Sequence, residues 1–273
     1  MLRSLYSGVS GMRGFQTKLD VIGNNIANVN TIGFKASRVM FKDILSQSIA
    51  GVSPPADNGR GGVNAKQIGL GVSVAAIDTL HTPGSAMTTN VVTDLRIDGD
   101  GFFLVSPTGE EDNVYLTRAG NFMLDANRNL VNPEGMRVMS VDGTPITLDE
   151  DIVAFTISES GEIIAVDDTG TATPTGTFIA VALVANPGGL EKVGGNLYRT
   201  TPNALGPEGL IVNQANDAAV GTGAIISGQL EMSNVDLTVE FTEMIVAQRG
   251  FQANSKIITT SDEVLQEILS LKR

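Results

Sequence analysis

The sequence predicts an α+β protein, in which a discontinuous helical coiled-coil domain from both ends of the chain accompanies a central all-β domain. Two observations carry this prediction. Apolar residues recur every seven positions near both ends of the 273-residue chain, which is typical of helices that pack side by side. Between the ends the apolar period falls to two, and short apolar runs alternate with Asp-Gly, Ser-Gly and Asn-Pro turn signals, which is typical of a sandwich or barrel.

The N-terminal segment is predicted to form a helix with one apolar stripe. Its glycines, Gly8, Gly11, Gly14 and Gly23, each cost a helix about 1 kcal/mol relative to alanine. Because most helical stability comes from packing, we expect this helix to become ordered only when it packs against partners. Its small residues would allow the backbone of a partner to approach closely. The stripe consists of Leu5, Val9, Met12, Phe15, Leu19, Ile22 and Ile26.

The C-terminal segment is predicted to form a second helix, with Asn234 or Asp236 as its N-cap. One seven-residue row of this helix is polar and contains Gln248, Ser255 and Asp262. Three polar residues in succession favour contacts with water or with other subunits over a closed intramolecular bundle. Both stripes are therefore predicted to form a subunit interface. The C-terminal stripe consists of Leu237, Phe241, Met244, Ile245, Phe251, Ile258 and Leu265.

The change of period divides the chain into three regions. Residues 1–32 and 230–273 are predicted to form the inner helical domain. Residues 33–72 and 218–229 are predicted to be connecting regions, because glycine, proline and asparagine are frequent in or beside them. Residues 73–217 are predicted to form the outer β-domain.

Composition excludes several kinds of chemistry. The chain has no cysteine, so disulfides, thiolate nucleophiles and cysteine-ligated metals are excluded. The formal net charge of −12 is uneven, with +4 in residues 1–50, −13 in residues 51–227 and −3 in residues 228–273. An acidic middle argues against nucleic-acid binding, and the opposite signs of the two ends favour their mutual attraction. No apolar run is long enough for membrane insertion or for a cleaved secretory signal.

No candidate site points to catalysis. The turn Asp98 to Gly101 lacks the spaced acidic ligands and the final glutamate of a calcium loop. The acidic runs Asp167–Asp168 and Glu110–Asp112 are typical of solvated surface. The single histidine, His81, has no evident acid–base partner. The sequence therefore predicts a protein that is not an enzyme and has no catalytic, cofactor or metal site.

Four segments together resemble one known family. They are residues 19–35 (LDVIGNNIANVNTIGFK), 94–103 (DLRIDGDGFF), 116–122 (LTRAGNF) and 233–256 (SNVDLTVEFTEMIVAQRGFQANSK). These segments resemble the N-terminal, central β-domain and C-terminal signatures of the bacterial flagellar rod and hook axial proteins. The resemblance spans nearly the whole chain. The residues that match the terminal signatures include Asn24, Asn25, Asn28, Gly33, Phe34, Gln248, Arg249 and Asn254.

Within that family, the opening residues, the segment 37–43 (SRVMFKD) and residues 257–269 most resemble the short hook proteins of Gram-positive bacteria. The resemblance implies a subunit that is exported unfolded through the flagellar type III apparatus, without a cleaved signal. Such a subunit would self-assemble into the curved hook tube, a universal joint that passes torque from rod to filament. The alternative is the distal rod protein, a rigid drive shaft. A secreted β-domain enzyme and a surface adhesin are further alternatives.

The resemblance also implies partners and a location. The expected partners are further copies of this chain in a helical tube, the distal rod, hook cap and hook–filament junction proteins, and the type III export apparatus. Neither nucleic acid nor a membrane is expected as a partner, and no cofactor is expected. The expected location is the flagellar hook or basal body outside the cell.

Overall fold

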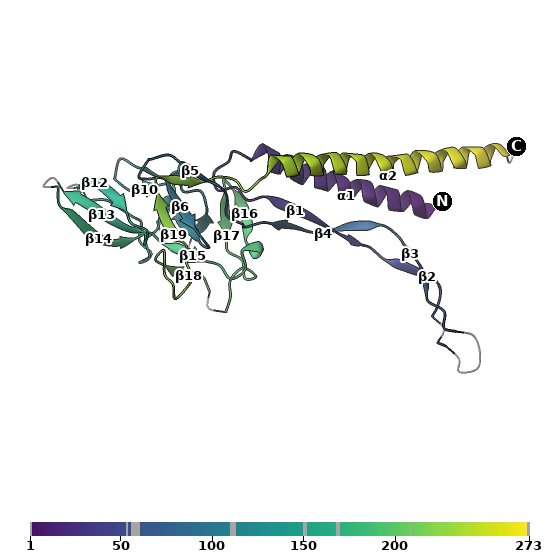
Figure 1. The fold of residues 1–273 in the computed structure, drawn as a ribbon, viewed down its shortest axis with the longest axis horizontal. Helices are drawn as coiled ribbons and strands as arrows, with labels where there is room; N and C mark the ends of the chain where they lie inside the picture. Colours follow the sequence, from purple (N-terminus) through teal and green to yellow (C-terminus); the bar gives the residue numbers. More distant parts are fainter. Residues whose placement is uncertain are drawn as a thin grey trace. The chain divides into compact units, whose positions relative to one another are not determined.

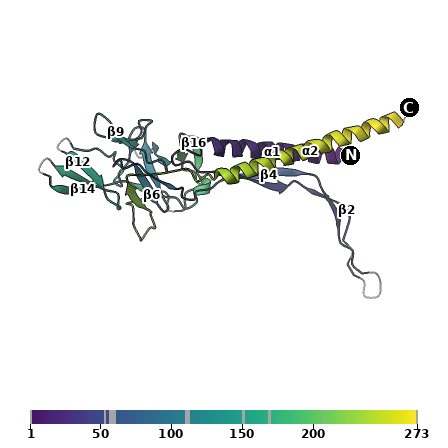
Figure 2. The same ribbon diagram turned by 45° about the horizontal axis from the view of Figure 1, so that its top comes forward.

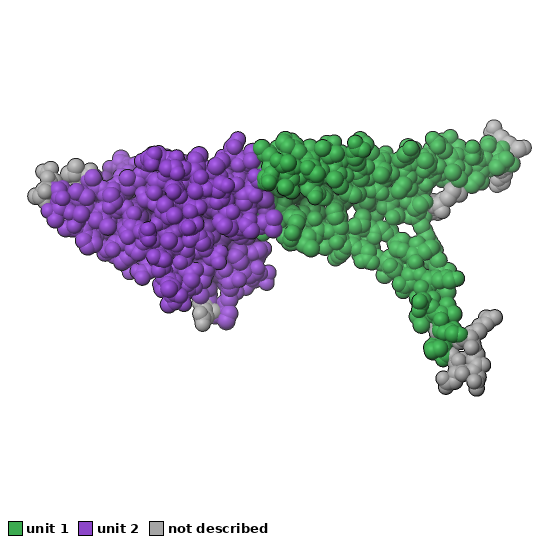
Figure 3. Space-filling model, viewed as in Figure 1, with its two compact units in different colours: residues 1–27, 37–79, 236–273 green, residues 28–36, 80–235 purple. Residues whose placement is uncertain are grey.

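A computed structural model describes residues 2–52, 54–55, 61–109, 113–149, 152–167, 170–207 and 209–271. It confirms the α+β class, because helices form near both ends and strands between them (Figure 1). The chain divides into two compact units (Figure 3). Unit 1 consists of Met1–Ala27, Ser37–Thr79 and Asp236–Arg273, and unit 2 consists of Asn28–Ala36 and Leu80–Val235.

In unit 1, helices α1 (Leu2–Ala27) and α2 (Leu237–Leu271) lie side by side (Figures 1 and 2). Glycines allow the close approach. A Cβ atom added at Gly11 would lie 2.8 Å from the side-chain nitrogen of Asn254, and one added at Gly250 would lie 2.6 Å from the ring of Phe15. The backbone that approaches the first helix is therefore the C-terminal helix of the same chain.

Helix α2 begins at a defined cap. The Asp236 carboxylate accepts hydrogen bonds from the backbone N–H groups of Thr238 at 2.8 Å and Val239 at 3.4 Å. These N–H groups have no intrahelical partner at a helix start, so the carboxylate stabilises the first turn. Of the two cap candidates in the sequence, Asp236 is the cap. Asn234 makes other contacts, which are described below.

A two-stranded ribbon completes unit 1, and α1 packs against its base. Residues 33–72, expected as a connecting region, contribute most of this ribbon. The period-two pattern is weak there because a two-stranded ribbon has no fully buried face to select for it. The assignment of residue ranges to inner, connecting and outer layers of an assembly stays a prediction. The antiparallel pairs are β1 (Ser37–Asp43) with β4 (Val72–Thr79), and β2 (Ser46–Ala50) with β3 (Lys66–Gly69).

Unit 2 is built from short antiparallel strands. Its largest sheet has the order β16-β17-β8-β7-β11-β10-β9, and β15 pairs with both β7 and β18. Strands β12, β13 and β14 form a separate sheet, and β19 pairs with β6 and β20 with β5. The bounds are β5 (Ala86–Thr88), β6 (Leu95–Asp98), β7 (Phe102–Ser106), β8 (Tyr115–Thr117), β9 (Met123–Leu124), β10 (Leu130–Val131), β11 (Arg137–Val138), β12 (Ile152–Ile157), β13 (Glu162–Asp167), β14 (Ala172–Phe178), β15 (Val181–Leu183), β16 (Glu191–Gly194), β17 (Leu197–Arg199), β18 (Ile211–Asn213), β19 (Ala224–Ser227) and β20 (Gln229–Glu231).

Strand β7 is the centre of unit 2, since it separates two hydrophobic clusters. Phe103 and Val105 belong to one cluster, and Phe102 and Leu104 belong to the other. Because successive side chains of a strand point to opposite faces, a strand buried on both faces reads as a continuous apolar run. Burial of β7 on both faces explains the continuous Phe-Phe-Leu-Val run in the sequence.

The glycines of the helix pair give a test of its packing. We expect Gly250→Leu to lower the thermal midpoint of α-helix unfolding, because the new side chain would overlap the Phe15 ring, and overpacking typically costs about 1–3 kcal/mol. Circular dichroism at 222 nm would follow the transition. Gly23→Ala is the control, because no atom lies within 4 Å of an added Cβ there and alanine favours helix. A midpoint for Gly250→Leu at or above that of the unmodified chain would contradict the packing described here.

Candidate functional site: an assembly surface and a buried charge cluster

Helix α2 presents exposed apolar side chains on two flanks. Leu237, Phe241 and Ile245 lie on one flank and are 39%, 50% and 54% exposed. At about 100° per residue, these three positions fall within roughly one quarter of the helix circumference. A contiguous exposed apolar patch on a folded protein marks an interaction surface. The other flank carries Val239, Val246, Ile257, Val264 and Ile268, which are also exposed.

The residues of the two predicted stripes differ in exposure: some are exposed, and the others are partly or fully buried. Of the C-terminal stripe, Leu237, Phe241, Ile245 and Phe251 are exposed, and Met244, Ile258 and Leu265 are partly buried. Of the N-terminal stripe, Ile22 is fully buried, and Leu5, Val9, Met12, Phe15, Leu19 and Ile26 are partly buried. The exposed members are available to other copies of the chain. Their role as a subunit interface stays a prediction.

Asn25 is the signature residue with the clearest structural role in unit 1. Its side-chain oxygen accepts from the Ser37 N–H at 3.0 Å, and its side-chain nitrogen donates to the Ser37 carbonyl at 2.8 Å and to Glu240 Oε1 at 3.0 Å. Asn25 is buried, so each of these hydrogen bonds satisfies a group that water does not reach. Burial raises the pKa of Glu240, and the hydrogen bond from Asn25 opposes the rise. Asn25 thus joins α1, β1 and α2.

The other signature residues have different environments. Asn254 contacts Gly11, as described above, and Asn28 accepts a hydrogen bond from the Thr31 hydroxyl at 3.1 Å. Gly33 and Phe34 are buried within unit 2. The side chains of Asn24, Gln248 and Arg249 lie on the exposed surface of the helices.

A cluster of three buried charged residues in unit 2 was not predicted from the sequence. Lys35 Nζ lies 2.6 Å from Glu231 Oε1, and Arg118 Nη1 lies 3.4 Å from Glu231 Oε2. The side chains are 0%, 1% and 4% exposed for Lys35, Glu231 and Arg118. Lys35 and Arg118 fall in family motifs, but no local pattern identifies Glu231 as their partner. The ion pair joins positions 196 residues apart in the sequence.

The Glu231 carboxylate therefore pairs with two buried cations, Lys35 and Arg118. Burial lowers the pKa of Lys35 and of Arg118, and the charge of Glu231 opposes this shift in both. Further hydrogen bonds support the charges. Glu231 Oε1 also accepts from the Gly84 N–H at 2.9 Å, and Lys35 Nζ donates to the Thr82 carbonyl at 2.7 Å. Charges can be buried when they are paired and hydrogen-bonded in this way.

Gly33 allows the segment that carries Lys35 to enter unit 2. It has φ +68°, and a Cβ atom added there would lie 2.6 Å from the backbone nitrogen of Ala119. Its N–H donates to the carbonyl of Glu231 at 2.8 Å. Any side chain at this position would meet rigid backbone, so the glycine of the N-terminal signature is a steric requirement.

The single histidine lies beside this cluster. The His81 ring centroid is 5.7 Å from that of Phe102 and 5.5 Å from that of Tyr198. Burial, reinforced by the charges of Lys35, Lys192 and Arg118, lowers the pKa of His81 to about 4. The ring is therefore neutral at physiological pH and packs as an aromatic side chain.

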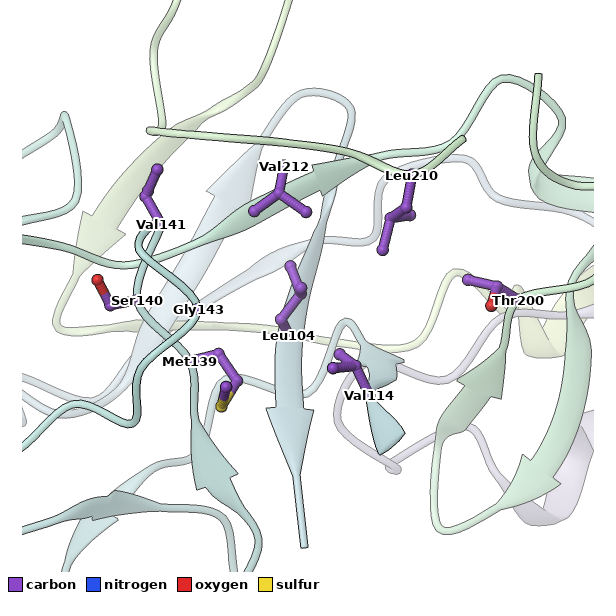
Figure 4. Close-up of a pocket in the computed structure, with 9 residues that line it drawn as sticks. All are labelled: Leu104, Val114, Met139, Ser140, Val141, Gly143, Thr200, Leu210 and Val212. Carbon is purple, nitrogen blue, oxygen red and sulfur yellow. The ribbon is translucent and has the colours of Figure 1, made fainter. Parts of the chain in front are cut away.

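Unit 2 also contains a pocket of about 350 Å³ (Figure 4). None of the nine residues that line it is ionisable, and aliphatic groups from Leu104, Val114, Leu210 and Val212 point into it. The pocket fits an apolar group and lacks the groups that acid–base catalysis needs.

The other segments that were considered as sites in the sequence are turns and acidic runs. The turn Asp98 to Gly101 connects β6 to β7, and Asp98 forms an ion pair with Arg96 at 3.0 Å. The acidic run 110–112 and Asp168 lie outside the described residues. In the described part of the chain, no group of three or more acidic, histidine or cysteine residues could hold a metal ion, and no helix is long and apolar enough to cross a membrane.

Comparisons with known proteins define the class. Three family models match: flagella basal body rod protein at residues 5–35, flagellar hook protein FlgE/F/G D1 domain at 96–165, and flagellar basal body rod FlgEFG protein C-terminal at 226–271. The chain is thus a structural component of the bacterial flagellum. It belongs to the flagellar rod and hook axial protein family, which confirms the family resemblance of its motifs. Members of this family form part of the basal body assembly.

Individual relatives correct the more specific expectation of a hook protein. The chain is 56% identical to the flagellar basal-body rod protein FlgG of Bacillus subtilis over the full length of both, and 36% identical to FlgG of Borreliella burgdorferi, also over both full lengths. It is only 30% identical to the flagellar hook protein FlgE of Borreliella burgdorferi, over an alignment of 455 positions. The hook prediction was wrong because it relied on short terminal segments, which hook and rod proteins share.

The environment of His81 gives a test by titration. We expect a pKa of about 4 from the C2 proton shift in NMR, which is unambiguous because the chain has one histidine. Between pH 6.5 and about 4 the unfolded chain takes up a proton that the folded chain does not, so the free energy of unfolding of unit 2 falls in this window. His81→Phe should show less of this fall. A measured pKa near 6.5 would contradict the buried, neutral ring.

Proposed function

We propose that this chain is a subunit of the distal flagellar rod, which self-assembles into a straight tube and transmits torque along the flagellar axis. The observation that carries the proposal is the exposed apolar surface of α2, on a chain that is 56% identical to a rod protein over its full length. This function is the alternative that the sequence left open.

The energetics of the helix surface support self-assembly. Full burial of a leucine, isoleucine or phenylalanine side chain contributes about 1.5–3 kcal/mol. Each copy exposes such side chains on two flanks of α2, and two separate contact surfaces allow a copy to bind two neighbours. An interface that is not self-complementary continues from copy to copy and produces a ring or a helical filament. In the proposed tube, the helices form the inner layer and the β-rich units lie outside. The contacts between neighbouring copies are made by the exposed flanks of α2.

The same proposal includes partners and location. Export through the flagellar type III apparatus without a cleaved signal suits a chain that has no cysteine to form a disulfide. In the flagellum the chain would contact further copies of itself and the adjoining rod and hook proteins, outside the cytoplasm. The expected contacts with hook cap and hook–filament junction proteins depended on the hook prediction and are not retained. A structural subunit of this kind has no catalytic activity.

The interface on α2 can be tested by one charge. We expect Ile245→Asp to abolish tube formation, because the exposed flank could no longer be buried without an unpaired carboxylate. Electron microscopy and sedimentation would measure assembly, and circular dichroism would show that the chain still folds. Thr242→Asp is the matched control, since it adds the same charge at an exposed polar position of the same helix. Normal tubes from Ile245→Asp would remove this flank from the interface.

The shape of the tubes distinguishes rod from hook. Tubes of the unmodified chain should be straight in electron micrographs, with a persistence length many times their diameter. Strongly curved tubes would contradict the rigid rod, and compact monomers at high concentration would contradict self-assembly altogether.

A further inference from the structure

The chain passes between the two units four times, between residues 27 and 28, 36 and 37, 79 and 80, and 235 and 236. Next to three of these crossings, the chain segments are hydrogen-bonded to one another inside unit 2. The Ala36 N–H donates to Asn234 Oδ1, the Asn234 side-chain nitrogen donates to the Leu80 carbonyl, and the Leu80 N–H donates to the Ala36 carbonyl. Each of these three distances is 2.8 Å.

Lys35 and Glu231 of the buried charge cluster, and the backbone groups of Thr82 and Gly84 that bind them, lie on the same three segments as these hydrogen bonds. Lys35 precedes Ala36, Thr82 and Gly84 follow Leu80, and Glu231 precedes Asn234. Glu231 binds the first segment through Lys35 and through the Gly33 N–H, and it binds the second through the Gly84 N–H. One side chain near the C-terminal helix therefore holds both of the other segments.

We propose that Glu231, with Asn234, is a clasp that fixes the points where the chain leaves unit 2, and that the negative charge of Glu231 is what keeps the clasp closed. Lys35 and Arg118 are both buried, and Glu231 is the anion that lies within ion-pair distance of them among the described residues. Without that charge, two cations would remain in the interior. Release of the segment 28–36 to water would relieve this cost, since it removes Lys35 from the interior.

The biological role of the clasp rests on the proposed rod function. In a rod subunit, the clasp would hold the chain segments beside the crossings in fixed positions. Residues 28–36 join α1 to β1, Leu80 follows β4, and Asn234 precedes α2. The four chain crossings are covalent links through which a subunit that transmits torque can pass force from one unit to the other. A closed clasp prevents the segments next to three of the four crossings from sliding past one another.

Hydrogen–deuterium exchange on the full-length monomer tests the clasp independently of assembly. In Glu231→Gln we expect exchange in residues 30–36 and 80–84 to become about a hundredfold faster, while β7 at the centre of unit 2 stays protected. Lys35→Met should change exchange less than tenfold, because the Glu231–Arg118 pair remains. Glu191→Gln is the matched control, because its ion pair with Arg199 is on the surface, and it should change nothing.

Three results would overturn the proposal. They are unchanged exchange in residues 30–36 of Glu231→Gln, an equal increase at β7, and an effect of Lys35→Met as large as that of Glu231→Gln. If Glu231→Gln does not fold, the triple variant Lys35→Met/Arg118→Met/Glu231→Gln decides, because it removes all three charges of the cluster. Its folding would support charge as the cause, and its failure to fold would contradict it. Failure of tube assembly by the unmodified chain would contradict only the rod function.

Discussion

One buried carboxylate in unit 2, that of Glu231, pairs with two buried cations and holds together three segments that are distant in the sequence. Glu231 comes from the segment just before the C-terminal helix, Lys35 from the segment just after the N-terminal helix, and Arg118 from the end of β8. Removing one partner of a buried ion pair typically costs about 3–5 kcal/mol, so the interaction is a strong constraint on which segments can lie together. It requires both ends of the chain to be present in unit 2, although most of each end belongs to unit 1.

Unit 1 combines close packing of its two helices with apolar side chains that stay exposed on α2. Gly11 on α1 and Gly250 on α2 make room for the side chains of Asn254 and Phe15 on the facing helix. Phe241 and Ile245 lie on an outer flank of α2 and remain exposed. This arrangement fits a subunit that is stable as a folded chain and still has apolar area to bury when it assembles. The proposed rod function rests on this exposed apolar area together with the full-length similarity to rod proteins.

Sequence reasoning succeeded where a physical signal is periodic and local. The seven-residue period predicted both helices, the period-two pattern with its turn signals predicted the β-rich middle, and the four motifs identified the family. It was less informative where the signal is weak or shared. Strands β1, β2 and β3 lie within residues 33–72, where the sequence predicts a connecting region, because a two-stranded ribbon has no fully buried face to select for alternation. The terminal segments of hook and rod proteins are too similar to distinguish the two, and only identity over the full length did so.

The sequence by itself determined the helical ends, the β-rich middle, the absence of thiol chemistry and the family. The tertiary structure decided which members of each apolar stripe face the chain's own second helix and which face outward, because periodicity identifies a face but not what covers it. It also decided that Glu231 pairs with Lys35 across 196 residues, and that Asp236 and not Asn234 caps α2. Long-range pairing depends on how the segments pack in three dimensions, and no local pattern in the chain encodes that.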